Sequence, residues 1–309
     1  MKLRVVARQA LTSEIEEFIL ADPAGKTLPA ADAGSHITIE TPAGAMRRYS
    51  LVHPGDQLST YTLAIKREPQ SRGGSTSMHD SALVGADLQV QAPSSDFVLG
   101  AKHGALLIAG GIGVTPIYAM AQSLVQQGRA VRVVYCAREE SMAAYAEALR
   151  ELCGDQLTLH LDHGDADQAF DFWDLLMEPT AEHIYCCGPA PLMEEVKGVT
   201  GHWPEGRVHF EEFKPVEVVR PDDHAFHIEL KHSNQTITVP SDKTILEALR
   251  DHGVRVVSSC ESGTCGTCKC AYSSGEVDHR DLVLMADEKA SHMMPCVSRA
   301  KGERLVLDI

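Results

Sequence analysis

Residues 258–270 read SSCESGTCGTCKC, so four thiols fall within eleven positions of a chain of 309 residues. Cys260, Cys265 and Cys268 are separated by four and then by two residues. A further thiol, Cys296, follows after 27 intervening residues. Three thiolates on one tight loop can converge on a small metal cluster, and a distant fourth can close the cage. The stretch therefore predicts a domain built around a metal centre.

The spacing C-x4-C-x2-C…C is typical of a plant-type [2Fe–2S] cluster. Gly263 and Gly266 lie inside the loop, where glycine allows backbone angles that turn amide N–H groups toward the sulfurs. A structural zinc site usually needs two short C-x2–4-C or H-x3–5-H pairs, whereas this chain has one C-x2-C. We therefore expect the four thiols named above to bind iron. Cys270 fits no ligand position, and we expect it to be a small core residue.

The composition predicts a multidomain globular protein. A chain of 309 residues exceeds one ordinary core, and 44% hydrophobic with 23% charged residues is ordinary for a soluble protein. No apolar run approaches the ~18–20 residues of a membrane span, and the N-terminus lacks the apolar segment of a secretory signal. Nine cysteines without an export signal favour a reducing compartment. We expect a cytoplasmic monomer.

The net charge of −15 is concentrated in the middle of the chain. Residues 103–213 carry 6 basic and 17 acidic side chains, which gives −11 of the total. Nucleic acids and anionic membranes attract basic surfaces. We therefore expect neither as a partner.

Three sequence patterns divide the chain. Residues 1–102 contain short alternating segments between Gly, Pro, Ser and Asp, which predicts a small antiparallel β-barrel or sandwich. Residues 103–218 alternate apolar strands with helical stretches, which predicts an α/β domain with a parallel sheet. Residues 214–223, KPVEVVRPDD, are rich in proline and charge and are the best candidate for a linker before the last domain. Residues 219–309 begin with a hairpin and a helix before the cysteine loop, which predicts an α+β domain.

Two stretches of the first domain suggest a site for a phosphorylated ring compound. The first is Arg47-Arg48-Tyr49-Ser50, in which an arginine can fork onto phosphate and an aromatic face can stack on a ring. The second is Arg72-Gly73-Gly74-Ser75, which precedes a predicted helix and offers backbone N–H groups to an anion. The first stretch has an ordinary structural interpretation, as a strand end.

The second domain contains a glycine-rich loop after its first strand, with the sequence GGIGVTP at residues 110–116. Such a loop lets the backbone approach a pyrophosphate at a helix N-terminus. The residues of this loop that we expect to contact a nucleotide are Gly110, Gly111, Gly113, Val114, Thr115 and Pro116. A second loop, Cys187-Gly188-Pro189, follows the strand HIYC. Cys187 either faces the bound nucleotide or is a core cysteine.

Taken together, these motifs resemble those of the phthalate dioxygenase reductase family over essentially the whole chain. The resemblance implies a ferredoxin-reductase-type flavin barrel, a nicotinamide domain and a β-grasp ferredoxin domain, in that order along the chain. It implies FMN as the flavin, NADH as the donor and a [2Fe–2S] cluster. In related reductases the ferredoxin domain comes first in the chain. The C-terminal position of the cysteines therefore favours this family over those reductases.

The resemblance also implies roles for individual residues. The flavin residues would be Arg47, Arg48, Tyr49, Ser50, Ile65, Lys66, Arg72, Gly73, Gly74, Ser75, Thr115 and Phe213. The nicotinamide nucleotide would contact the two loops above and Arg138. Lys66 has an alternative role as an exposed strand lysine, and Phe213 either covers the flavin or packs the last strand. Arg138 would attract a 2′-phosphate, whereas Glu139 and Glu140 would repel it, so the choice between NADH and NADPH stays open.

These cofactors predict a protein that converts paired electrons into single ones. NADH gives two electrons as a hydride and a [2Fe–2S] cluster takes one, so a flavin must stand between them. The chain has no C-x-H…C-x2-H pair of Rieske type, and the oxygen chemistry must belong to a partner. The family implies a Rieske-type oxygenase acting on aromatic carboxylates. The alternatives are another iron enzyme such as a P450, or a redox-sensing module.

Overall fold

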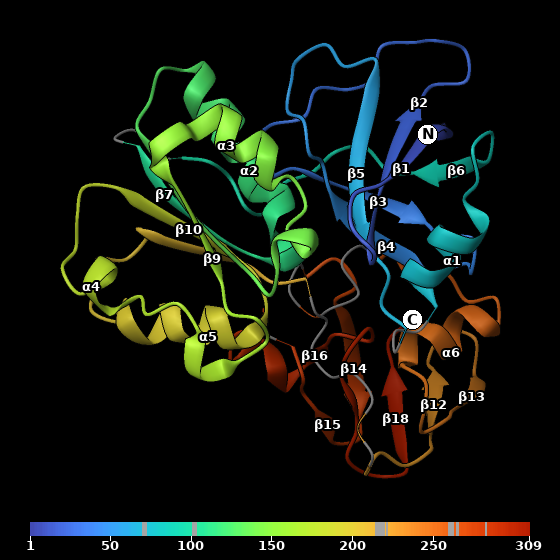
Figure 1. Cartoon of the computed structure of the whole chain (residues 1–309). Helices are drawn as coiled ribbons and strands as arrows, with labels where there is room; N and C mark the ends of the chain where they lie inside the picture. The colour runs from blue at the N-terminus through green and yellow to red at the C-terminus, as the bar shows by residue number, and fades with distance from the viewer. Residues whose placement is uncertain are drawn as a thin grey trace. The chain divides into compact units, whose positions relative to one another are not determined.

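The computed structural model describes residues 1–69, 73–100, 104–213, 220, 222–258, 263, 266–281 and 283–309 (Figure 1). The chain forms two compact units, Met1–Phe213 and Lys214–Ile309. The boundary between them falls in the predicted linker. The domain limits at 102/103 and 218/219 remain predictions. Three of the predicted site residues, Arg72, Cys260 and Cys265, lie outside the described residues.

The first unit begins with a six-stranded antiparallel sheet in the order β4-β3-β6-β1-β2-β5. Its strands are β1 (Lys2–Ala10), β2 (Ile15–Ala21), β3 (His36–Glu40), β4 (Met46–Ser50), β5 (Thr60–Lys66) and β6 (Asp87–Val90). The outermost strands β4 and β5 contact each other, so the sheet curls on itself. Inward residues such as Phe18, Ile37 and Leu63 are fully buried. The predicted antiparallel β fold is confirmed.

The N-terminal segment forms two strands. β1 and β2 pair in antiparallel fashion around a turn at residues 11–14. The Thr12 hydroxyl accepts hydrogen bonds from the backbone N–H groups of Glu14 and Ile15, which closes the turn. The helix predicted after the Gly-Gly pair is α1 (Gly74–Ser81).

A parallel five-stranded sheet follows, in the order β11-β10-β7-β8-β9. Its strands are β7 (Ala105–Gly110), β8 (Val131–Ala137), β9 (Leu157–Leu161), β10 (His183–Cys187) and β11 (Val208–Glu211). The helices are α2 (Val114–Gln126), α3 (Ala146–Cys153), α4 (Trp173–Leu176) and α5 (Ala190–Val199). Figure 1 shows α2 and α3 on one face of the sheet and α4 and α5 on the other. The predicted doubly wound α/β fold is confirmed.

Strand β7 lies at the centre of this sheet, with β8 on one side and β10 on the other. The chain therefore winds outward in both directions from β7. In open α/β sheets, ligands bind beyond the carboxyl ends of the strands at such a reversal point. The Gly110–Gly113 loop and the Cys187–Pro189 loop follow the carboxyl ends of β7 and β10, which are neighbours at this point.

Specific contacts join the antiparallel and parallel sheets of the first unit. The Gln122 side chain on α2 donates to the carbonyl oxygen of Val52 at 2.8 Å. The Tyr145 hydroxyl donates to a Glu17 carboxylate oxygen on β2 at 2.7 Å. The Tyr145 ring stacks on Tyr118 with centroids 5.2 Å apart. These contacts fix the two predicted cofactor domains against each other.

The second unit contains a mixed sheet in the order β13-β12-β18-β14-β16. Its strands are β12 (Phe226–Leu230), β13 (Gln235–Val239), β14 (Cys270–Ser274), β16 (His292–Met293) and β18 (Arg304–Leu307), with a separate pair β15 (Val277–Asp278) and β17 (Arg299–Ala300). The predicted hairpin is β12–β13, and Asn234 in its turn has a φ of 53°. The predicted helix is α6 (Ile245–Asp251), which Thr244 and Glu247 cap reciprocally.

Among the described residues, no helix has the length and apolar character needed to cross a membrane.

Candidate functional site

The N-terminus of α1 has the features of a phosphate site. Gly73 precedes the helix with a φ of 83°, no side chain caps the first turn, and this turn contains no acidic residue. A Cβ atom on Gly74 would lie 2.9 Å from Nε of Arg47, so the glycine leaves room for the guanidinium. An uncapped helix start beside an arginine attracts an anion. These residues therefore fit the phosphate end of a flavin mononucleotide.

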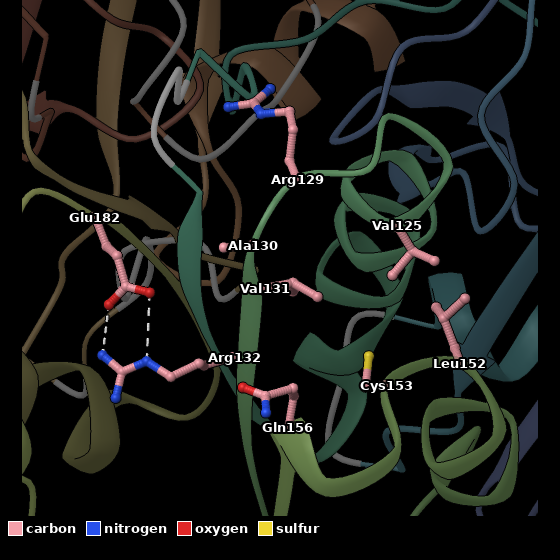
Figure 2. Close-up of a pocket in the computed structure, with 9 residues that line it drawn as sticks. All are labelled: Val125, Arg129, Ala130, Val131, Arg132, Leu152, Cys153, Gln156 and Glu182. Atoms are coloured by element: carbon pink, nitrogen blue, oxygen red, sulfur yellow. Dashed lines mark hydrogen bonds and ion pairs between the residues drawn. The ribbon is translucent and has the colours of Figure 1, made fainter.

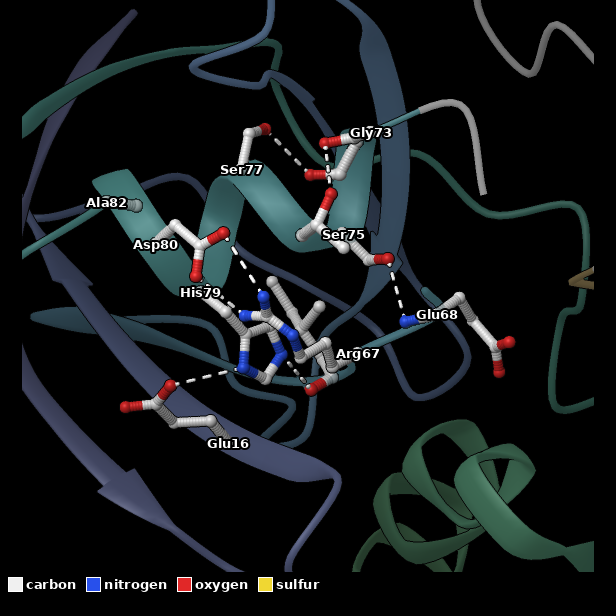
Figure 3. A network of polar contacts seen from close by, with 12 residues as sticks. Glu16, Arg67, Glu68, Gly73, Ser75, Ser77, His79, Asp80 and Ala82 are labelled. Atoms are coloured by element: carbon white, nitrogen blue, oxygen red, sulfur yellow. Dashed lines mark hydrogen bonds and ion pairs between the residues drawn. The ribbon is translucent and has the colours of Figure 1, made fainter. Parts of the chain in front are cut away.

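A network of polar contacts holds α1 against the preceding strand (Figure 3). The backbone N–H of Glu68 donates to the Ser75 hydroxyl at 3.0 Å. Arg67 pairs with Asp80 at 2.7 Å, and hydrogen bonding from this arginine lowers the pKa of Asp80. His79 contacts the carbonyl oxygen of Ile65 at 2.9 Å. Ser75 and His79 thus position the helix that carries the candidate phosphate site.

Strand β4 separates its two arginines, because successive residues of a strand point to opposite faces. Arg47 lies against the start of α1, as described above. Arg48 donates from Nε to the buried His36 at 2.7 Å and pairs with Asp96 at 2.5 Å. Burial raises the pKa of the Tyr49 hydroxyl. The positions on β4 therefore favour Arg47 over Arg48 as the phosphate residue.

The two predicted flavin residues of β5 differ in exposure. The Ile65 side chain is 1% exposed in the core of the antiparallel sheet, so only its backbone can face a ligand. Lys66 contacts Glu68 at 3.0 Å and Glu14 at 3.5 Å. Desolvation lowers the pKa of Lys66, but its bonds to these two carboxylates outweigh this effect, and the pKa is raised.

The structure brings the two predicted nucleotide loops into direct contact. A Cβ atom on Gly113 would lie 2.2 Å from the carbonyl oxygen of Cys187, and one on Gly110 would lie 2.5 Å from Cδ of Pro189. Only glycine permits this approach of the two backbones. Thr115, 2% exposed, donates from its hydroxyl to the Ile112 carbonyl oxygen at 3.1 Å.

Helix α2 begins at Val114, directly after this contact, and its first turn contains no acidic residue. The helix start thus faces the carboxyl edge of the sheet, where a pyrophosphate is expected. Arg138 is exposed just beyond the carboxyl end of β8 on the same edge. The two loops and this arginine therefore fit an extended dinucleotide.

Sequence reasoning missed one residue at this edge, Glu211. It ends β11 and pairs in register with Cys187, the last residue of β10. Its Oε2 atom is buried and has no hydrogen-bond partner among the described residues. Cys187 is 1% exposed, and burial raises the pKa of its thiol. The sequence motifs identify only Phe213 in this segment, because the register that places Glu211 beside Cys187 is not visible in the sequence.

Phe213 lies two residues beyond β11 and is 42% exposed. A residue that packed the last strand into the core would be buried, so this exposure disfavours the packing role. Its prediction as an aromatic cover for the flavin stays a prediction.

A pocket with a cavity volume of about 430 Å³ lies at the opposite edge of the parallel sheet (Figure 2). Its lining includes Val131 at the amino end of β8 and Glu182 immediately before β10. Glu182 pairs with Arg132 at 2.5 Å. Because nucleotides bind at the carboxyl edge of such sheets, this pocket is separate from the candidate nucleotide site.

The described part of the cysteine motif is compatible with an iron–sulfur cluster. Cys268 and Cys296 are 2% and 1% exposed and belong to one buried cluster of side chains, although 27 residues separate them. Gly263 and Gly266 have φ angles of 77° and 76°, as the sequence predicted. A Cβ atom on Gly263 would lie 2.8 Å from Val297. Two buried thiols in one cluster of side chains, with described glycines at positive φ near Cys268 in the sequence, fit a [2Fe–2S] cluster.

The remaining described cysteines have structural positions. Cys270 is 5% exposed in the core of the mixed sheet, as predicted. Cys136, Cys153 and Cys186 pack in the cores of the parallel-sheet domain. Burial raises the pKa of each of these thiols, which keeps them protonated and unreactive.

Comparisons with known proteins agree with this geometry. Residues 107–198 match the oxidoreductase NAD-binding domain family, and residues 228–301 match the 2Fe-2S iron-sulfur cluster binding domain family. The chain is 42% identical to the phthalate dioxygenase reductase of Burkholderia cepacia over 100% of its length and 97% of that protein. It is 40% identical to the phthalate 4,5-dioxygenase oxygenase reductase subunit of Pseudomonas putida, covering 99% of this chain and 96% of that one.

A solved structure of phthalate dioxygenase reductase superposes with a TM-score of 0.88 at 41% identity, covering 100% of this chain and 98% of that one. The three folds, together with these full-length matches, define a nicotinamide-dependent flavin and iron–sulfur reductase of an oxygenase system. The chain belongs to the phthalate dioxygenase reductase family.

Proposed function

We propose that the chain takes electrons from NADH through FMN to a [2Fe–2S] cluster and delivers them to a separate Rieske-type oxygenase. The acceptor would be a dioxygenase or demethylase for phthalate-like aromatic compounds. The observation that carries the proposal is the full-length match to reductases whose names include phthalate dioxygenase, phthalate 4,5-dioxygenase and vanillate O-demethylase. We further propose that the protein is cytoplasmic and monomeric.

The residues divide the work among three sites. The start of α1 and Arg47 would hold the flavin phosphate, and Tyr49 with Ser50 would border its ring. A bound flavin accepts a hydride from a nicotinamide and returns the two electrons singly. The contact between the two glycine loops would hold the nucleotide at the carboxyl ends of β7 and β10. The four thiols of residues 260–296 would hold the cluster.

NADH is the proposed donor. Glu139 and Glu140 follow β8 beside the exposed Arg138, and Glu140 is paired with Arg150. This pairing leaves Glu139 as the carboxylate that disfavours a 2′-phosphate near Arg138. Comparison of kcat/KM for NADH and NADPH tests the assignment, which predicts a preference for NADH.

The experiment that tests the electron path replaces Cys265 by Ser. The variant should keep NADH-dependent ferricyanide reduction, because this acceptor can take electrons directly from the flavin. It should lose the reduction of cytochrome c and of a reconstituted Rieske-type oxygenase. Undiminished oxygenase turnover by the variant would rule out the cluster as the exit.

A second candidate acceptor is a cytochrome P450. The chain superposes with part of an intact type IV self-sufficient cytochrome P450 monooxygenase at a TM-score of 0.74 and 35% identity, over 100% of this chain and 41% of that one. Parallel reconstitution with a Rieske-type oxygenase and a P450 distinguishes the two. We expect efficient turnover only with the Rieske-type partner.

A further inference from the structure

Glu211 has a buried carboxyl oxygen, Oε2, that makes no hydrogen bond to any residue that the structure describes. It ends β11, opposite Cys187 in the parallel register between β10 and β11. Although the residue keeps some exposure, its Oε2 atom is enclosed and makes no hydrogen bond to the described residues. A buried carboxylate without a hydrogen bond is costly, so the position has a reason other than stability.

The charges that face Glu211 come from several elements. Burial raises its pKa to about 8, Arg48 on β4 opposes this shift, and Asp96 adds to it. Arg48 is already engaged by Asp96 and His36, so its charge is shared. Glu211 in turn raises the pKa of the Cys187 thiol, as does Glu212 to a lesser extent. The carboxyl group is therefore neutral near pH 7 and within reach of titration.

The position connects the two halves of the proposed redox site. Arg48 lies on the strand that carries Tyr49 and Ser50, the candidate flavin residues. Cys187 begins the loop proposed for the nicotinamide. We propose that Glu211 exchanges the proton that accompanies electron transfer between nicotinamide and flavin, an inference that rests on the proposed function.

The proton balance shows why such a group is useful. In the reductive half, a bound dihydronicotinamide would give its C4 hydrogen and the electron pair of that bond to the flavin. The O–H bond of Glu211 would break at the same stage, and its proton would bind the reduced flavin and neutralise the added negative charge. In the oxidative half, two electrons leave singly and two protons are released. One of them re-forms the O–H bond of Glu211 and the other enters solvent, which gives one proton per NADH oxidised.

The test compares three variants of the holoenzyme. Glu211→Gln cannot exchange a proton, whereas Glu211→Asp can. Glu212→Gln is the matched control, because this neighbouring carboxylate is exposed and pairs with Lys197 at 2.7 Å. Anaerobic stopped-flow mixing with NADH, monitored at the flavin absorbance from about pH 6 to about pH 10, gives the reduction rate for each.

The wild-type rate should fall about tenfold per pH unit above about pH 8, toward the rate of Glu211→Gln, as expected for loss of one acidic group. Glu211→Gln should be at least about tenfold slower at pH 7 and independent of pH in this range. Glu211→Asp should keep a break in its pH–rate profile, that is, a pH above which the rate falls, but at a shifted pH. Glu212→Gln should have the wild-type profile. An unchanged break in Glu211→Gln would overturn the proposal.

A second readout does not depend on turnover. The infrared spectrum of the oxidised holoenzyme in D2O should contain the C=O stretching band of a protonated carboxyl group at neutral pH. The band should disappear as the pH rises through about 8 and should be absent from Glu211→Gln. Absence of the band from the wild type would also overturn the proposal. If Glu211→Gln fails to fold, Glu211→Asp provides the test. A shift in the pH at which its flavin reduction rate begins to fall supports the proposal, and the wild-type pH refutes it.

These outcomes are distinct from failure of the proposed function. A different terminal acceptor would change the oxygenase assay and leave the pH dependence of flavin reduction unaltered. Loss of the pH break alone in Glu211→Gln would support the proton role whatever the acceptor.

Discussion

Replacing Asp223 by Asn should destabilise the iron–sulfur unit. Asp223 accepts two hydrogen bonds from Arg280, at 2.9 and 2.5 Å, and lies 3.5 Å from Nε of Arg299. The three side chains are 6%, 4% and 2% exposed, respectively. The carboxylate also accepts the backbone N–H of Arg220 at 2.8 Å, which ties the start of the unit to the same network.

The size of the destabilisation is set by the positive charge of Arg280 and Arg299, which is buried and would lose the compensating charge of Asp223. Removal of one partner of a buried pair typically costs about 3–5 kcal/mol. Asp278 remains 2.6 Å from Nε of Arg280, and the Arg299 guanidinium keeps hydrogen bonds to three backbone carbonyl oxygens. We therefore expect a loss at the lower end, about 3 kcal/mol in the free energy of unfolding of this unit.

The effect should also depend on pH with a defined sign. Burial opposes ionisation of Asp223, but hydrogen bonds from Arg280 outweigh it, and the pKa is lowered. The stabilisation is then complete above the pKa of an unfolded aspartate and is lost as the pH falls through the lowered pKa. The difference between wild type and Asp223→Asn should be full at neutral pH and should shrink on acidification.

The assay is guanidinium denaturation followed by the visible absorbance of the cluster, which reports on this unit. Glu276→Gln is the control, because Glu276 and Lys301 form a surface pair whose side chains are 72% and 53% exposed. An exposed pair contributes about 0–1 kcal/mol, so this variant should unfold near the wild-type midpoint. Equal midpoints for Asp223→Asn and Glu276→Gln would refute the reasoning.

Three further predictions concern other parts of the chain. Gly113→Ala should lower the free energy of unfolding by about 1–3 kcal/mol and weaken NADH binding, because the new Cβ would lie 2.2 Å from a backbone carbonyl oxygen. The control is Gly198→Ala, at a helix position with open space around it, which should leave the melting temperature unchanged or raise it. Tyr145→Phe removes a hydrogen bond to a Glu17 carboxylate and should lower the free energy of unfolding by about 1.5–3 kcal/mol. Denaturant titrations measure this loss, and wild-type stability of the variant would contradict the prediction. Cys268→Ser should yield protein with about the wild-type flavin content but less than half the iron and acid-labile sulfide, and full iron content would contradict its role as a ligand.

Most of the fold was predictable from local patterns. Alternating residues predicted the antiparallel sheet, and the change to apolar strands followed by helices predicted the parallel one. The cysteine spacing and the glycines with positive φ identified the third domain. The turn at residues 11–14, LTSE, contains no Gly, Pro, Asn or Asp that would mark it in the sequence. The Thr12 hydroxyl and the backbone N–H groups of Leu11 and Thr12, which donate to the Ile15 carbonyl oxygen, close it.

The site was less predictable than the fold. The Gly110–Gly113 and Cys187–Pro189 loops were identified from their places after strands, but their direct contact depends on β7 and β10 being neighbours in the sheet, which the sequence does not record. The different contacts of Arg47, which lies against the start of α1, and Arg48, which bonds to His36, were not expected, because they depend on which face of β4 each residue occupies. Glu211 was missed because its significance comes from strand register and from an absent hydrogen bond, neither of which a linear motif records.

The central claim is that a flavin and a [2Fe–2S] cluster in this chain are reduced in sequence by NADH. An anaerobic NADH titration, followed by visible absorbance and electron paramagnetic resonance, tests it most directly. The account predicts bleaching of the flavin together with the signal of one reduced [2Fe–2S] cluster per chain, with FMN released on denaturation. Flavin bleaching without a cluster signal, or a preparation that contains zinc and no acid-labile sulfide, would contradict it.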